Sequence, residues 1–210
     1  WLTAWVVRGY ENQPNVFAAS HPCLTSTGST LTSTTDACFT ASHPEPFEVL
    51  VVNDDGYAAP GIGALVDAVY ALPNVAVHVV APLTNQSGGG GNVTKPPYAI
   101  SGSAVVTSGN KPATAVSSND PVKLDGSGWP ADAVLYAIKN LQLSPELVLS
   151  GINSGQNMGP VVSLSGTVGA ARRARNNGMP AIASSQGFGD DFPSGVVATL
   201  ALLEEWRLGR

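Results

Sequence analysis

Two adjacent carboxylates directly after a short apolar run are the first residues in this chain that suggest chemistry. Residues 49–52 read Val-Leu-Val-Val, the pattern of a strand buried on both faces of a parallel sheet, and they are followed by Asn53, Asp54, Asp55 and Gly56. Two carboxylates held close together raise each other's pKa, and a divalent cation that prefers oxygen ligands removes the repulsion. The alternative for this segment alone is a turn whose side chains make local hydrogen bonds.

Two further polar segments follow predicted buried strands. Residues 75–81 form an apolar run that leads into the polar residues 85–87, and residues 146–150 lead into a glycine-rich segment that contains residues 153–157. In a parallel sheet, ligands bind at the edge formed by the carboxyl ends of the strands, so we expect the three polar segments to lie together there. Two carboxylates, a hydroxyl and an amide carbonyl suit Mg²⁺ or Mn²⁺, with water completing an octahedron.

A predicted helix begins at Ser165, Gly166 and Thr167, and its start is a candidate for anion binding. Backbone N–H groups and the helix dipole favour a phosphate dianion there, and Gly166 would let it approach closely. The alternative is an ordinary N-cap. A metal ion beside a phosphate pocket polarises the phosphoryl oxygen and lowers the pKa of a bound water. The predicted reaction is therefore phosphomonoester hydrolysis, by in-line attack of that water on phosphorus.

The elements that must position these residues alternate between strands and helices. The pattern predicts strands at 49–52, 75–81, 146–150 and 180–184 and helices at 61–72, 130–141, 167–177 and 194–208. This alternation predicts an α/β fold with a doubly wound, mostly parallel sheet and right-handed crossovers. Residues 97–125 contain several short strand-like runs, which predict an antiparallel excursion from the sheet.

The composition limits the class of protein. The chain has 210 residues, of which 43% are hydrophobic, enough for one α/β domain with a substantial core. Only 12% are charged, about half of the usual ~25% share. The net charge of −5 and the scarcity of clustered Lys and Arg argue against binding to a nucleic-acid polymer. No apolar run approaches the ~20 residues that span a bilayer, so we expect no membrane partner.

Residues 1–46 differ in composition from the rest and are predicted to be a Ser/Thr-rich N-terminal extension. They hold both cysteines, Cys23 and Cys38, with fourteen residues between them. We expect these cysteines to form a disulfide, which would place the protein in an oxidising compartment, extracellular or periplasmic. Two free thiols in a cytoplasmic protein are the alternative. Two prolines mark the boundary with an α/β domain that spans residues 47–210.

Several segments of the chain together resemble the SurE family of survival-protein nucleotidases and phosphatases. They occur in the family's order and spacing, and they are NDDGYAAPGI (53–62), APLTNQSGGGGNVT (81–94), WPADAV (129–134), PELVLSGINSGQNMG (145–159) and SLSGTVGAA (163–171). By this resemblance the fold is Rossmann-like, and the activity is the metal-dependent release of phosphate from nucleoside monophosphates. The resemblance also implies a homo-oligomer.

The same resemblance implies roles for individual residues. The metal ligands would be Asp54, Asp55, Ser87 and Asn153, and the residues that carry catalysis would be Asp54, Asp55 and Asn153. The phosphate side of the site would be lined by Asn53, Gly56, Asn157, Ser165, Gly166 and Thr167. The implied cofactor is a divalent metal, Mg²⁺ or Mn²⁺, and the implied substrate is a small phosphomonoester.

The chain also departs from the family pattern. Leu164 occupies a position that is often Tyr or His, Trp129 stands where Thr is common, and Arg173 replaces a Glu. The family's C-terminal hairpin and swapped arm would follow Arg210, and we expect the α/β domain to lack them. None of these departures replaces an implied metal ligand. They favour a second hypothesis, in which a non-catalytic or weakly active protein serves as a structural, self-assembling or ligand-binding subunit.

Overall fold

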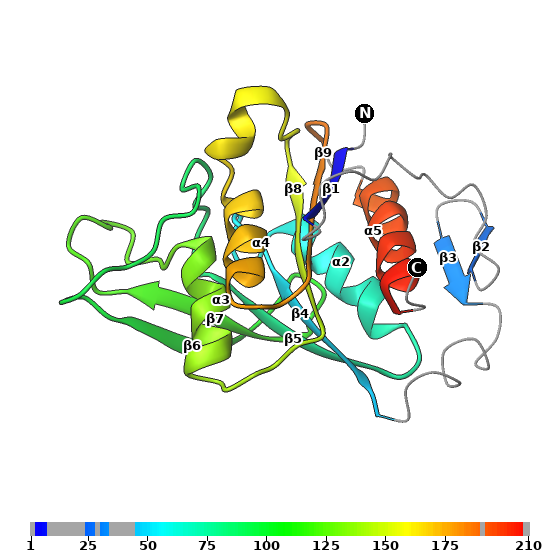
Figure 1. Cartoon of the computed structure of the whole chain (residues 1–210), viewed down its shortest axis with the longest axis horizontal. Helices are drawn as coiled ribbons and strands as arrows, with labels where there is room; N and C mark the ends of the chain where they lie inside the picture. Colours follow the sequence, from blue (N-terminus) through cyan, green and yellow to red (C-terminus); the bar gives the residue numbers. More distant parts are fainter. Residues whose placement is uncertain (1–2, 8–23, 28–29, 34–44, 190–191, 208–210) are drawn as a thin grey trace.

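The structure, a computed structural model, describes residues 3–7, 24–27, 30–33, 45–189 and 192–207 (Figure 1). The strands are β1 (Thr3–Val7), β2 (Leu24–Thr27), β3 (Thr30–Ser33), β4 (Phe47–Val52), β5 (Val75–Pro82), β6 (Ile100–Val106), β7 (Pro112–Ser118), β8 (Leu147–Ser154) and β9 (Ala181–Gln186). The helices are α2 (Pro60–Tyr70), α3 (Pro130–Lys139), the 3₁₀ helix η1 (Gly159–Ser163), α4 (Gly166–Asn176) and α5 (Phe192–Arg207). The antiparallel pair β2–β3 forms a small sheet of its own.

Seven strands form the main sheet, in the order β1-β9-β8-β4-β5-β7-β6. The five strands from β9 to β7 run parallel, whereas β1 pairs antiparallel with β9 and β6 pairs antiparallel with β7. The chain continues from β4 to β5 on one side and later adds β8 on the other, so the strand order switches beside β4. The predicted doubly wound, mostly parallel sheet is confirmed, and the β6–β7 hairpin is the predicted antiparallel excursion.

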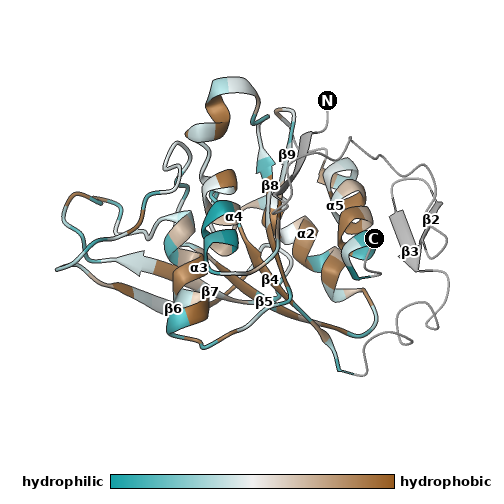
Figure 2. Cartoon of the chain, in the orientation of Figure 1, coloured by the Kyte–Doolittle hydropathy of each residue, from teal (hydrophilic) through white to brown (hydrophobic). Residues whose placement is uncertain are grey.

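Strand β4 is buried on both faces, as its sequence predicts. Val49 and Val51 pack into a core with α2 and α5, whereas Leu50 and Val52 pack into a second core with α3 and α4. All four side chains are 0% exposed. The helices therefore form one layer on each face of the sheet (Figure 1), and the central strands are the most hydrophobic part of the molecule (Figure 2). This arrangement fixes the direction in which the carboxylates leave β4.

The main difference from the sequence prediction concerns strand β8, which the sequence places at 146–150. In the structure β8 extends to Ser154, after a register shift between Ser150 and Asn153. The shift includes Gly151, whose φ of 139° and close approach to Ser184 leave no room for a side chain. Asn153, predicted to lie in a loop, instead pairs with Ser185 in the ladder to β9. The sequence prediction failed because polar, glycine-rich residues lengthen an apolar strand here.

Several sequence predictions fall on residues 1–46. Cys23 and Cys38 lie outside the described residues, so the predicted disulfide stays a prediction, as does the N-terminal extension. Within the part of the chain that the structure describes, no helix has the length and hydropathy needed to cross a membrane.

Candidate metal and phosphate site

Asp54 leaves the end of β4 and lies against the start of α4. Its side chain is 2% exposed, and its Oδ1 accepts a hydrogen bond of 2.7 Å from the Thr167 hydroxyl. A Cβ on Gly166 would lie 2.7 Å from the Asp54 Cβ, so only glycine allows this packing. Burial raises the pKa of Asp54, and hydrogen bonds from the Thr167 hydroxyl and from backbone N–H groups partly oppose that rise. The N-terminus of α4 thus holds this carboxylate.

Asp55 points toward two other strand ends. Its Oδ1 accepts a hydrogen bond of 3.0 Å from the Asn85 amide, and its Oδ2 accepts a bond of 3.4 Å from the Ser154 backbone N–H. Burial and, second to it, the neighbouring Asp54 charge together raise the pKa of Asp55 to about 6, although hydrogen bonds from the Ser154 N–H and the Asn85 amide oppose the rise. The second carboxylate therefore links the loop after β5 to the end of β8.

Backbone contacts join the carboxylate turn to the loop after β5. The Gln86 N–H donates to the Asp54 carbonyl at 2.6 Å. Gly56 has a φ of 99°, and a Cβ there would lie 3.1 Å from the Thr84 carbonyl carbon. The two loops are therefore in direct contact, and the turn requires a residue that adopts a positive φ and has no side chain.

The polar residues near the end of β8 are held by their own amide groups. The Asn153 Nδ2 donates to the Gly155 carbonyl at 2.7 Å, and the Asn157 Nδ2 donates to the Ser185 hydroxyl at 2.7 Å. Both side chains are buried. Because the Asn153 nitrogen is used in this way, its amide oxygen is the group that remains for a cation.

Other predicted site residues have different surroundings. Ser87 is exposed, and its backbone N–H donates to the Asn85 amide oxygen at 2.9 Å. Asn53 is 0% exposed; its Nδ2 donates to the Gly56 carbonyl at 2.8 Å, and its Oδ1 is buried without a hydrogen-bond partner. The Ser165 hydroxyl accepts from the Val168 N–H at 3.1 Å and is the N-cap of α4. Asn53 and Ser165 thus brace the backbone, and their phosphate contacts stay predictions.

The chemistry of Asp54, Asp55 and the neighbouring loops fits a divalent cation. Two adjacent carboxylates with raised pKa values favour a positive charge, and the loops around them supply neutral amide and hydroxyl oxygens. Among the residues that the structure describes, no group of three or more His, Cys, Asp or Glu side chains is placed to hold a metal. The donor set is therefore two carboxylates with neutral oxygens, which is the hard-oxygen chemistry of Mg²⁺ and Mn²⁺.

A pocket of about 320 Å³ lies beside Asp55. Its polar lining comes from Asp55, Asn85 and Ser154, and its other walls come from residues 59–61 and Phe192. Asn85 and Ser154 lie in polar segments that the sequence places at this edge of the sheet, but neither is among the predicted site residues. Phe192 begins α5, a helix distant in the sequence, and no sequence pattern indicates its place here.

The raised pKa of Asp55 predicts how the stability of the metal-free protein depends on pH. In the folded protein this pKa is about 6, above the ordinary value of 3.8, so folding favours the protonated carboxyl. Its contribution to stability is complete below about pH 4 and is lost as the pH rises through about 6. We expect the melting temperature to fall more steeply over this range in the wild type than in Asp55→Asn, by calorimetry.

Asp67→Asn is the matched control for this experiment, because Asp67 is an exposed carboxylate on α2. It should keep the steep wild-type profile. Parallel profiles for the wild type and Asp55→Asn would contradict the prediction.

Comparisons with known proteins found a matching family and curated relatives. A family model described as survival protein SurE matches residues 49–205. A 5'-nucleotidase SurE from Methanopyrus kandleri is 40% identical over 146 residues, which are 66% of this chain and 48% of that protein. A 5'-nucleotidase SurE from Alkalilimnicola ehrlichii is 38% identical over 164 residues, which are 77% of this chain and 57% of that protein.

The fold is also that of a solved relative. The crystal structure of the SurE protein from Aquifex aeolicus matches with a TM-score of 0.58 and 32% identity, over 77% of this chain and 60% of that one. The chain spans about half the length of the curated relatives it matches. Since the family model covers most of the chain, including every loop of the site, this protein belongs to the SurE family.

Proposed function

We propose that this protein is a metal-dependent phosphomonoester hydrolase that acts on nucleoside monophosphates. The observation that carries the proposal is the placement of Asp54 and Asp55, which together contact the loop after β5, the end of β8 and the start of α4. The relatives named 5'-nucleotidase SurE support the same activity and substrate class.

Each residue has a role that follows from its contacts. Asp54, Asp55, Ser87 and Asn153 would hold the cation, which is Mg²⁺ or Mn²⁺ in this proposal. When bound, such a cation polarises a phosphoryl oxygen and lowers the pKa of a water molecule. Thr167 fixes the orientation of the Asp54 carboxylate, while Asn85 and the Ser154 backbone fix that of Asp55. These hydrogen bonds set the ligand geometry before any substrate binds.

The pocket beside Asp55 is the place that we assign to the organic part of the substrate. Its volume of about 320 Å³ lies at the lower end of the range for small-molecule pockets, ~300–1,000 Å³. Asn85 and Ser154 offer polar contacts, and Pro60 and Phe192 offer apolar ones. Such a mixture suits a nucleoside better than a highly charged leaving group.

Removal of divalent metal is expected to abolish the activity. Phosphate release from AMP and from p-nitrophenyl phosphate should fall to background after dialysis against EDTA and should return with Mn²⁺ or Mg²⁺. The physical reason is that two uncompensated carboxylates would repel a phosphate dianion. Turnover that persists without metal, or an absence of turnover at any metal concentration, would overturn the proposed function. The second outcome would favour the non-catalytic alternative.

The extension and the assembly belong to this proposal as well. We propose that residues 1–46 form an extension closed by a Cys23–Cys38 disulfide, which adds strand β1 to the edge of the sheet of the α/β domain, residues 47–210. We also propose that the protein is a homo-oligomer. Intact mass after alkylation without reductant separates a disulfide from two free thiols. A disulfide favours an extracellular or periplasmic location, whereas free thiols favour the cytoplasm.

A further inference from the structure

Gln86 lies next to the predicted metal ligand Ser87, and its amide is bound at both ends. The side chain is 6% exposed. Its Nε2 donates to the Thr84 hydroxyl at 3.2 Å and to the Asp125 carboxylate, and its Oε1 accepts from the Lys123 ammonium. The backbone N–H of the same residue donates to the Asp54 carbonyl. One buried residue therefore connects the turn after β4 with a segment that lies outside the site.

Lys123 is unusually enclosed for a lysine. Its side chain is 7% exposed, and its Nζ lies 3.5 Å from the centroid of the Trp129 ring and 3.9 Å from an Asp125 oxygen. Burial lowers the pKa of Lys123, and the neighbouring carboxylates, Asp125 first, oppose that change. The aromatic face of Trp129 also favours the charged ammonium. The ammonium is thus fixed between the Gln86 amide, an indole ring and an acid.

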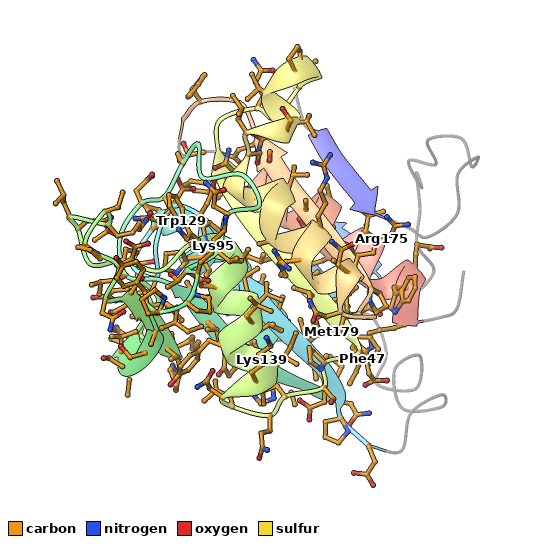
Figure 3. The ribbon with its side chains drawn as sticks, turned by 60° about the vertical axis from the view of Figure 1, so that its left-hand side comes forward. Phe47, Lys95, Trp129, Lys139, Arg175 and Met179 are labelled. Carbon is orange, nitrogen blue, oxygen red and sulfur yellow. The ribbon has the colours of Figure 1, made fainter. Side chains whose placement is uncertain are left out.

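Trp129 also supports the glycine-rich loop that follows Ser87. A Cβ on Gly89 would lie 2.7 Å from the Trp129 ring, so the ring lies directly against the loop backbone. Trp129 is the N-cap residue of α3, and it lies at one end of this helix, among the loops, with Lys139 toward the other end (Figure 3). Trp129, Lys123 and Asp125 all come from the segment between β7 and α3.

We propose that Lys123 and Asp125 are positioning residues for the metal loop, residues 85–87: they hold the Gln86 amide from its two ends and thereby fix the place of Ser87. The inference rests on the proposed function. Ser87 is itself exposed, so its position depends on the buried residue before it. Residues that orient metal ligands in this way typically change metal affinity by about 10–100-fold when they are replaced.

The proposal also accounts for Trp129, which departs from the family pattern. In this chain the ring and Lys123 occur together, in direct contact.

The test measures Mn²⁺ affinity by isothermal titration calorimetry on metal-free protein, together with the melting temperature of each variant. Lys123→Met keeps most of the side-chain volume but removes the charge and the donors. Its expected Mn²⁺ Kd is about 10–100-fold weaker than that of the wild type. Lys139→Met is the matched control, because Lys139 is exposed at the far end of α3, and its Kd should not change.

Asp125→Ala tests the other end of the Gln86 amide. The Asp125 side chain is 39% exposed, so this variant should fold even if Lys123→Met does not. Its Mn²⁺ Kd should also weaken, by about 10-fold or more. In addition, Lys123→Met should have little further effect in a Gln86→Leu background, because both changes remove the same contact.

The outcomes separate this inference from the proposed function. If wild-type protein binds no Mn²⁺, or if Asp54→Asn binds it equally well, the metal site itself is wrong. If Asp54→Asn loses Mn²⁺ but Lys123→Met and Asp125→Ala keep the wild-type Kd, only the positioning role is overturned. A lower melting temperature with an unchanged Kd would show that these residues are merely structural, and it too overturns the inference. Should Lys123→Met fail to fold, the Kd of Asp125→Ala decides alone.

Discussion

Asp54→Asn is expected to lower kcat/KM for phosphate release by more than about 100-fold, because it removes a charged ligand rather than a residue that orients one. The fold should survive the change, since the amide oxygen of Asn can still accept the hydrogen bond from Thr167. Burial raises the pKa of Asp54, so the ionised carboxylate destabilises the metal-free protein. The variant should therefore melt at or above the temperature of the metal-free wild type. Activity and melting temperature, measured on the same samples, check both parts.

The control for Asp54→Asn is Asp67→Asn, the same replacement at an exposed carboxylate on α2. It should leave both measurements unchanged. Metal-dependent turnover by Asp54→Asn within about 10-fold of the wild type would contradict the assigned role, since loss of a metal ligand should exceed that range.

Gly169→Ala is expected to give the largest loss of stability of any alanine substitution proposed for this protein. A Cβ at this position in α4 would lie 1.9 Å from the Gly90 carbonyl oxygen and 2.4 Å from its carbon. These atoms are backbone, so either the helix or the glycine-rich loop must move. Overpacking costs about 3 kcal/mol at its upper range. For a chain of this size that loss corresponds to a decrease in melting temperature of roughly 6–12 °C.

Gly91→Ala is the matched control for this prediction, because a Cβ on Gly91 meets no atom within 4 Å. It should change the free energy of unfolding by less than about 0.5 kcal/mol. The displaced loop follows Ser87, so Gly169→Ala should weaken metal binding as well. Equal melting temperatures for Gly169→Ala and Gly91→Ala would show that helix and loop are less tightly packed than described.

The sequence predicts the scaffold of the site because topology alone brings distant segments together. The apolar run at 49–52 predicts a strand buried on both faces, and three polar segments after parallel strands must share one edge. The structure confirms that the segments meet, through Asp55 with Asn85 and Ser154. The rule that parallel strands end on the same side of the sheet is sufficient for this prediction.

The sequence does not predict contacts that depend on exact packing. Thr167 and Asp54 lie 113 positions apart, and no sequence pattern predicts that the helix start expected to bind phosphate also holds a carboxylate of the site. The ladder position of Asn153 depends on an irregularity at Gly151, which no periodicity indicates. The enclosure of Lys123 arises in an irregular segment between β7 and α3, where hydrophobic pattern carries no information about side-chain partners.

The division of β4 side chains between two cores has a consequence for how this protein can diverge. A replacement on either face of β4 would disturb the positions of the same two acidic residues, Asp54 and Asp55. Both faces of the strand are therefore under selection. Strand β6, at the edge of the sheet, is largely solvent-accessible and carries no such restriction, whereas its partner β7 contributes Val116 to the second core. Sequence changes are therefore expected to accumulate along β6, while the centre of the sheet stays nearly invariant.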